Sequence, residues 1–202
     1  MRRAAESSGP IILSDTGDSV FGGAGGDSTV LLAELLRARG PRALVPMVDA
    51  PAARALTAAG PGARVRVQVG GTVTGWFEPL DLTVTVRAAT HLVLSPGDGY
   101  QDDRVDMGAT AVAEVDSVTL VISERPGVAG NHPALYEHFG LDPSEYGALV
   151  LKTASNFQWF RAMTTQVIRA NTPGPTQTDI TALSWERAPR PIYPVDPVDD
   201  WR

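Results

Sequence analysis

The sequence contains no cysteine, which excludes disulfide bonds, thiolate metal sites and a cysteine nucleophile. It also contains no long hydrophobic run, since stretches such as Leu149 to Leu151 and Leu120 to Ile122 are far too short to span a bilayer. The start, MRRAAESSGPIIL, carries two arginines but no apolar stretch of the length that a signal sequence needs. We therefore expect a soluble, cytoplasmic protein without membrane contact.

Positive charge is also scarce. The 202 residues include 17 basic and 23 acidic side chains, which gives a net charge of −6 at pH 7, and the basic residues form no cluster. Nucleic acids and anionic membranes bind through dense positive charge, so neither is an expected partner. Hydrophobic residues at 43% and charged residues at 20% are the balance of an ordinary globular protein, and we expect one domain over residues 1–202.

Lysine is the scarcest basic residue. Lys152, in the stretch GALVLKTASNF, is the only lysine, and the other sixteen basic residues are arginines. A position that keeps lysine suggests a need for a compact charge on a flexible stem, where a planar guanidinium is unsuitable. Chance is the alternative interpretation, and the sequence leaves both open.

Strands alternate with helices at both ends of the chain. Short apolar runs indicate buried strands, and amphipathic or alanine-rich segments with capping residues, such as Asp49, indicate helices. The predicted strands are 11–14, 43–48, 148–153 and 165–171, and the predicted helices are 27–40, 49–60, 132–140 and 155–163. This alternation predicts parallel strands joined by right-handed crossovers.

The middle of the chain has a different pattern. RVRVQV and LDLTVTVRA alternate strictly between apolar and polar residues, and TAVAEV and SVTLVIS flank a predicted hairpin turn at Asp116. Such strands form antiparallel sheets with one solvent face. The sequence therefore predicts an α/β fold, with a mainly parallel sheet, flanking helices and an antiparallel β insertion at about residues 63–124. The proline-rich tail from Thr172 on is expected to lie extended over the surface.

Polar loops follow two of the predicted parallel strands. Asp15 and Asp18 come after the first strand, and Lys152, Ser155 and Asn156 come at the end of another. Ligands bind beyond the carboxyl ends of strands in open parallel sheets, so central placement of both strands would bring Lys152 to Asp15 and Asp18 at one rim. Lys152 is then either a ligand contact or the partner in a structural salt bridge.

The glycine-rich loop GGAGGDST invites comparison with phosphate-binding loops. The nucleotide-hydrolase motif needs lysine where this chain has Asp27, and the dinucleotide motif fails because Ser28 stands where its third glycine is required. Acidic residues surround the loop and oppose anion binding, which makes nucleotide binding a weak hypothesis. We expect the glycines to form a tight turn and Asp27 to cap the following helix.

A complete catalytic set is not evident. His91, His132 and His138 lack the spacing of metal ligands on one helix face, and His132 is expected at the surface or as a capping residue. Ser28 is not in a nucleophile elbow, because Val30 occupies the position where that motif has glycine. The aromatic residues Phe157, Trp159 and Phe160 are expected to pack in the core. The residues alone predict no metal site in this chain.

Four ordered stretches together run from about residue 10 to 196: IILSDTGDSVFGGAGGDSTVLLAELL, VPMVDAPAARALTAAGPGARVRVQVGG, VLKTASNFQWFRA and RPIYPVD. In this order they resemble the C-terminal domain of the MlrC family, the microcystinase C-like metallopeptidases of bacteria. The positions that match the family's motifs are Asp15, Asp18, Gly22, Gly23, Gly26, Asp27 and Lys152. Relatives often carry histidine and arginine where this chain has Asn156 and Gln158, which puts any role of that histidine in doubt here.

The resemblance implies a zinc-dependent hydrolase of peptide or amide bonds. It further implies that the zinc ligands lie in a larger N-terminal domain, so this chain would hold no cofactor and would be inactive alone. Its expected partner is that metal-binding domain, from the same gene or a neighbouring one, and a homo-oligomer is possible. The expected role is to contribute cleft-rim residues, for which the candidates are Asp15, Asp18, Gly22, Gly23, Gly26, Asp27, Lys152, Ser155 and Asn156. The alternative is a stand-alone binding module without catalytic activity.

Overall fold

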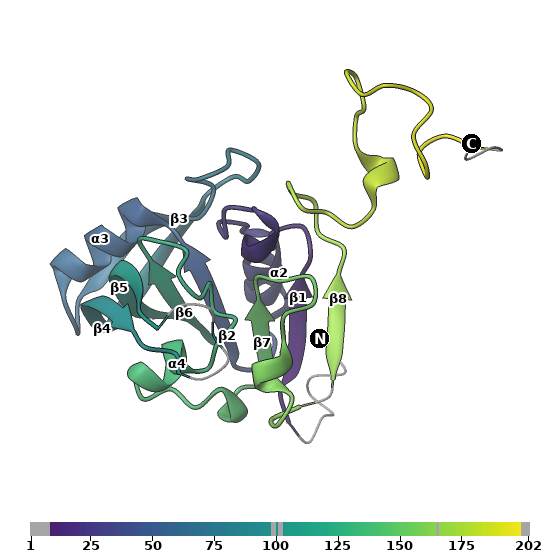
Figure 1. Ribbon diagram of the computed structural model, residues 1–202. Coiled ribbons are helices and arrows are strands. Elements are labelled where there is room, and N and C mark those ends of the chain that lie inside the picture. The colour runs from purple at the N-terminus through teal and green to yellow at the C-terminus, as the bar shows by residue number, and fades with distance from the viewer. Residues whose placement is uncertain (1–8, 98–99, 101–102, 165, 199–202) are drawn as a thin grey trace.

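The eight strands found among the described residues form one mixed sheet. The computed structural model describes residues 9–97, 100, 103–164 and 166–198. The strands are β1 (Ile11–Asp15), β2 (Ala43–Val48), β3 (Arg64–Val69), β4 (Leu80–Leu94), β5 (Val105–Val115), β6 (Val118–Ser123), β7 (Ala148–Leu151) and β8 (Val167–Ala170). Their order across the sheet is β3-β4-β5-β6-β2-β7-β1-β8 (Figure 1).

Parallel and antiparallel pairing divide this sheet into two parts. The pairs β6–β2, β2–β7, β7–β1 and β1–β8 are parallel. The pairs β3–β4, β4–β5 and β5–β6 are antiparallel. The predicted α/β fold with an antiparallel segment is therefore confirmed. The antiparallel strands extend the same sheet, because β6 pairs both with β5 and with β2.

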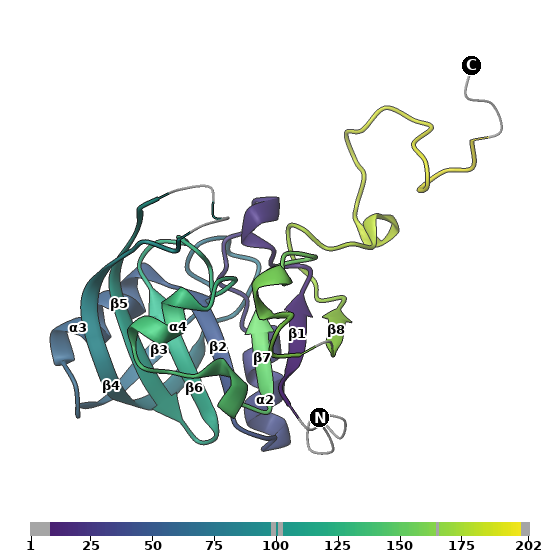
Figure 2. The same ribbon diagram turned by 60° about the horizontal axis from the view of Figure 1, so that its bottom comes forward.

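Helices and loops cover the two faces of the sheet. On one face, α2 (Val30–Ala38) and α3 (Ala50–Ala59) bury Leu32, Leu35 and Leu56 against the strands. On the other face, α4 (Ala134–His138) and the loop after β7 bury Tyr136 and Phe160. Figure 2 shows α4 on the side of the sheet opposite to α3. This layering leaves the carboxyl ends of β1 and β7 to be covered by loops.

The antiparallel part is more buried than its alternating pattern predicted. β3 and β4 do alternate between exposed and covered residues. In contrast, all six residues of β6 are buried, and most of β5 is buried as well. The prediction of one solvent face is wrong for these two strands because they lie in the middle of the sheet, where α3 packs over β5.

The predicted helix at 155–163 is absent. Only one short 3-10 turn, η3 (Gln158–Phe160), forms there. The side chain of Thr153 accepts hydrogen bonds from the amides of Ser155 and Asn156, which favours a turn. Phe160 is fully buried, and Phe157 and Trp159 pack against the same core. Their spacing does not suit one helix face, so burial of these rings determines the local conformation.

The tail does not lie over the surface along its whole length. Residues 172–176 contact the turn after β1, and the chain then leaves the body of the domain (Figures 1 and 2). The later residues bond mainly to one another: Asp179 caps the turn η4 (Ile180–Ala182), and the amide of Ile192 donates to Asp196. Two sequence interpretations concern positions outside the described residues. One is the lack of a signal sequence in the segment before Gly9, and the other is Thr165 as the first residue of the strand predicted at 165–171.

Candidate functional site

The candidate site lies where β1 and β7 end. These strands are adjacent and parallel, with Ile11 opposite Ala148, so the turn after β1 and the loop after β7 meet at one edge of the sheet. The Nζ atom of Lys152 lies 3.1 Å from Oδ2 of Asp15 and 3.0 Å from Oδ2 of Asp18. It also donates to the carbonyl oxygen of Ser28, at 2.9 Å. The predicted convergence of Lys152 with the two aspartates is therefore confirmed.

This cluster is buried, which the sequence did not predict. The exposed fraction is 1% for the Lys152 side chain and 0% for those of Asp15 and Asp18. An ammonium group has three donors, and the three acceptors around Nζ can use all of them. Lys152 therefore has no donor to spare for a ligand in this chain. The geometry favours the structural salt bridge over direct ligand contact.

The two carboxylates hold the surrounding loops through their remaining lone pairs. Asp18 accepts hydrogen bonds from the amides of Gly26 and Ser28, both at 2.8 Å. Asp15 accepts one from the hydroxyl of Thr172, far along the chain. Backbone N–H groups that point at a buried carboxylate are strong, charge-assisted donors. The glycine loop is thus wrapped around Asp18, and the segment after β8 is tied to Asp15.

Burial and charge pairing act in opposite directions on these groups. Burial by itself would lower the pKa of Lys152, but the nearby Asp15 and Asp18 outweigh it and raise the pKa above the usual lysine value. Burial raises the pKa of Asp18 above the usual aspartate value, although the charge of Lys152 and the hydrogen bond from the Ser28 amide partly oppose this. The lysine is therefore charged at neutral pH, and its charge is needed to hold two carboxyl groups away from water.

Asp27 does not cap the helix that follows it, so that prediction was wrong. The cap position of α2 is Thr29, and the cap makes no side-chain hydrogen bond. The carboxylate of Asp27 instead accepts from the amides of Val73 and Thr74, at 2.8 and 3.0 Å. These residues belong to the β3–β4 loop, residues 70–79. The amide donors that this buried carboxylate needs therefore come from a loop that is distant in sequence.

The nine predicted site residues fall into two groups. Five are buried behind the loops: Asp15, Asp18, Gly26, Asp27 and Lys152. Four reach the surface: Gly22, Gly23 and Ser155 are exposed, and Asn156 is half-buried. The amide of Val20 donates to the carbonyl of Lys152 at 3.1 Å, which joins the turn η1 (Val20–Gly22) to the loop after β7. Only this second group is accessible for the rim role that was predicted for all nine residues.

Two threonines of the tail complete the site, and the sequence analysis missed both. The amide of Gly17 donates to Thr172 Oγ1 at 3.0 Å, and the amide of Ser19 donates to Thr176 Oγ1 at 2.9 Å. Thr176 Oγ1 also donates to the carbonyl of Thr16, at 3.0 Å. We call residues 172–176 the strap. A proline- and glycine-rich segment is typical of exposed tails, so no local pattern indicates this contact.

His132 was expected at the surface or as a cap, and the surface placement is wrong. Its Nδ1 atom accepts from the amide of Ala134 at 3.2 Å, close to the start of α4. Its ring lies against Tyr100 and Trp159, with centroid separations of 5.7 and 5.1 Å. Only 8% of the residue is exposed. Burial therefore lowers the pKa of His132 below 6.5, although Glu137 partly opposes this.

A lowered pKa at His132 predicts a loss of stability in acid. The unfolded chain takes up this proton first, so stability is lost as the pH falls from 6.5 through the lower pKa of the folded state. We expect His132→Asn, whose Oδ1 matches the position of Nδ1 and can still accept from the Ala134 amide, to lose less stability than the native chain between about pH 7 and about pH 5. Urea unfolding at both pH values measures this difference. Equal losses in the two proteins would contradict the assignment.

The described residues include no group of three or more histidine, aspartate or glutamate side chains that could hold a metal ion. The best-placed carboxylates, on Asp15 and Asp18, already surround the ammonium of Lys152. The donors that zinc prefers are therefore not assembled in this part of the chain.

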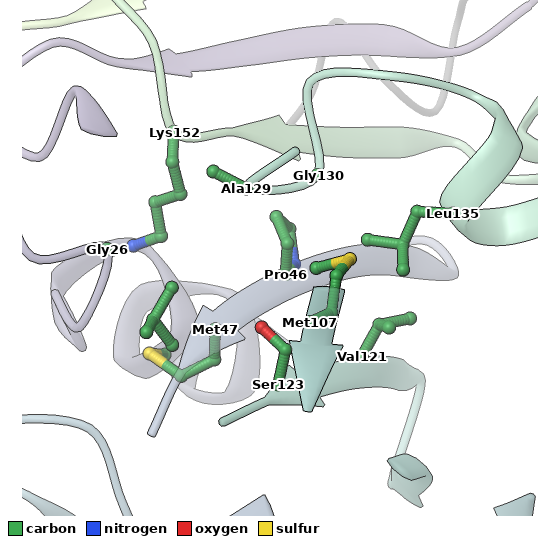
Figure 3. Close-up of a pocket in the computed structure, with 11 residues that line it drawn as sticks. Gly26, Pro46, Met47, Met107, Val121, Ser123, Ala129, Gly130, Leu135 and Lys152 are labelled. Atoms are coloured by element: carbon green, nitrogen blue, oxygen red, sulfur yellow. The ribbon is translucent and has the colours of Figure 1, made fainter. Parts of the chain in front are cut away.

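The pocket beside Lys152 is too small to bind a ligand. Figure 3 shows the lysine stem passing from the end of β7 toward Gly26, above Pro46 and Met47 of β2. The space enclosed there does not admit a molecule the size of water. It is a packing gap, opened because β2 pairs with β7 only at Ala43 and Leu44.

No described helix has the length and apolar character needed to cross a membrane.

The mixed sheet and its lysine–aspartate cluster define an α/β domain with a loop-covered carboxyl edge. The model of the family described as MlrC C-terminus matches residues 13–187, and the chain belongs to this family. It is also similar to the crystal structure of a "putative metallopeptidase" from Mesorhizobium sp. BNC1, with a TM-score of 0.84 and 30% identity. A search of curated proteins found no match.

The structural match has an uneven coverage. It spans 100% of this chain but only 40% of the Mesorhizobium chain. The resemblance inferred from the four sequence motifs is thus confirmed at the level of the family. The activity of a whole MlrC-like protein is a separate question.

Proposed function

We propose that this chain is the C-terminal domain of an MlrC-like, zinc-dependent hydrolase of peptide or amide bonds. It docks against a metal-binding N-terminal domain and supplies part of the cleft rim. The observation that carries the proposal is the match of the entire chain to 40% of a larger protein whose name describes a metallopeptidase. Zinc in such hydrolases polarises the carbonyl group and activates a water molecule.

The arrangement of the site is consistent with a domain that contributes to substrate binding and does not hold the metal. The described residues assemble no metal-ligand group, so the metal would come from the rest of the protein. The exposed residues Gly22, Gly23 and Ser155 and the half-buried Asn156 lie at the carboxyl edge of the sheet, where α/β proteins bind their ligands. The backbone amides of these four residues already donate hydrogen bonds within the chain. The Ser155 hydroxyl group and the Asn156 carboxamide are suited to hydrogen bonds with a peptide backbone.

The buried cluster has a different role in this proposal. Lys152, Asp15 and Asp18 do not reach substrate; they position the glycine loop and the loop after β7. Rigid support of this kind is what a precise binding rim requires. Lysine suits this position because one small cation satisfies the three acceptors that surround it.

Co-expression tests the proposed function. The chain is produced alone and together with the MlrC-like N-terminal segment encoded in the same genome, and hydrolysis of a linear peptide mixture is followed by mass spectrometry. We expect a stable complex with hydrolytic activity and an inactive isolated chain. A chain that binds no such segment would instead support the stand-alone binding module, and peptide hydrolysis by the chain alone would contradict the proposal.

A further inference from the structure

Large apolar side chains are exposed at the carboxyl edge of the sheet. Among the described residues, Val73 and Trp76 of the β3–β4 loop are 55% and 53% exposed, and Phe21 of η1 is 51% exposed. The loop's own neighbouring residue, Phe77, is buried. The chain therefore turns one aromatic ring inward and the adjacent one outward. An exposed tryptophan in a fixed loop is typical of a binding surface.

Buried aspartates hold this loop at two points. At its base, Asp49 accepts from the amide of Gly70 at 2.7 Å while also capping α3. Nearer its tip, Asp27 accepts from the amides of Val73 and Thr74 and from the Thr74 hydroxyl group at 3.0 Å. Both carboxylates are 0% exposed. Charge-assisted bonds to buried carboxylates make the exposed tip a preorganised element, which lowers the entropic cost of binding.

The loop also packs directly on the glycine loop. The amide of Gly71 donates to the carbonyl of Asp27 at 2.9 Å, and the Thr29 hydroxyl donates to the carbonyl of Glu78 at 2.9 Å. A Cβ atom on Gly25 would come within 2.7 Å of Thr74 and 3.0 Å of Val73, so the two loops are in close contact. Figure 1 shows both loops at the same end of the sheet. Val73 thus lies against Gly25, in the same glycine loop that carries the exposed Gly22 and Gly23.

The length of the related protein indicates what covers this surface. The Mesorhizobium chain has about 60% of its length outside the matched region, given that the match covers 40% of it. We propose that the β3–β4 loop, through Val73 and Trp76, is the anchor on which the N-terminal domain of the MlrC-like protein docks, with Phe21 at the margin of the contact. This inference rests on the proposed function and adds the surface to it.

Binding measurements with a double variant test the anchor. The partner is the MlrC-like N-terminal segment encoded in the same genome, and the dissociation constant is measured by isothermal titration calorimetry. We expect Val73→Ser/Trp76→Ser to weaken binding at least about tenfold, because a central tryptophan contributes strongly to binding at interfaces. Ile168→Ser is the matched control, since Ile168 is 37% exposed on β8, at the opposite end of the strand order from β3, and it should leave binding unchanged. Both variants alter exposed side chains, and equal melting temperatures would show that each is folded.

The possible outcomes separate the surface from the function. Weakened binding only in the double variant supports the anchor. Tight binding that survives the double substitution overturns the anchor and leaves the proposed function intact. If neither the native chain nor the double variant binds the N-terminal segment, the proposed function itself fails. If light scattering shows that the chain alone forms a stable dimer through Val73 and Trp76, and this dimer persists with the segment present, the occupant is a second copy and the proposal is wrong.

Discussion

Replacing Lys152 with methionine is expected to lower the free energy of unfolding by about 3–5 kcal/mol, the usual effect of removing one member of a buried ion pair. Methionine has a similar length and fills the channel of the lysine stem, but it leaves Asp15 and Asp18 buried without their counter-charge. Natural domains are stable by only about 5–15 kcal/mol, so this loss should be severe. Urea unfolding followed by circular dichroism measures it.

A double variant separates charge from packing. Lys152→Met/Asp15→Asn has the same net charge in the cluster as the native chain, because one cation and one anion are removed together. It should therefore recover part of the stability that the single variant loses. Lys152→Arg should remain destabilised, since a planar guanidinium cannot place one nitrogen among Asp15, Asp18 and the Ser28 carbonyl. A single Lys152→Met variant within about 1 kcal/mol of the native protein would contradict this account of the cluster.

The second large effect is expected at Gly17, where the strap crosses the turn after β1. A Cβ atom at this position would lie 2.2 Å from the carbonyl oxygen of Thr172 and 2.6 Å from that of Pro173. Both obstacles are backbone atoms, so a rotamer change cannot relieve the overlap. We expect Gly17→Ala to cost about 3 kcal/mol and to displace the strap, which would remove the hydrogen bond from Thr172 to Asp15. Thermal unfolding and limited proteolysis within 172–176 report both effects.

Gly9→Ala provides the comparison for Gly17→Ala. Among the described residues, a Cβ atom there would come within 4 Å of the Met163 carbonyl alone, at 3.6 Å, an ordinary van der Waals contact. This variant should match the native chain in melting temperature and in resistance of the strap to protease. If Gly17→Ala behaved in the same way as Gly9→Ala, the tight crossing of strap and turn would be excluded.

The positions of Asp15, Asp18 and Lys152 could be predicted because they depend on the topology of the sheet. Two short apolar runs that end in polar residues become parallel neighbours, and their carboxyl ends must then coincide. The depth of the cluster could not be predicted. It depends on the strap, and nothing in the composition of residues 172–176 distinguishes them from the exposed tail that follows.

Asp27 illustrates a second limit of sequence analysis. An aspartate just before an amphipathic helix is typical of a cap, and Asp49 fulfils that expectation for α3. At Asp27 the same local pattern is overridden by a contact with Val73 and Thr74, 46 and 47 residues away. The helix predicted at 155–163 failed for a similar reason, because the burial of Phe160 outweighed local propensity. Local patterns cannot report contacts that only the folded chain creates.

Zinc content is the measurement that tests the central claim most directly, namely that this domain supports a metal centre located elsewhere in the protein. Elemental analysis is carried out on the purified chain alone and on its complex with the MlrC-like N-terminal segment. We predict far less than one zinc per chain for the isolated domain and about one or more per complex. Stoichiometric zinc in the isolated chain, lost when His91, His132 and His138 are replaced, would contradict the account.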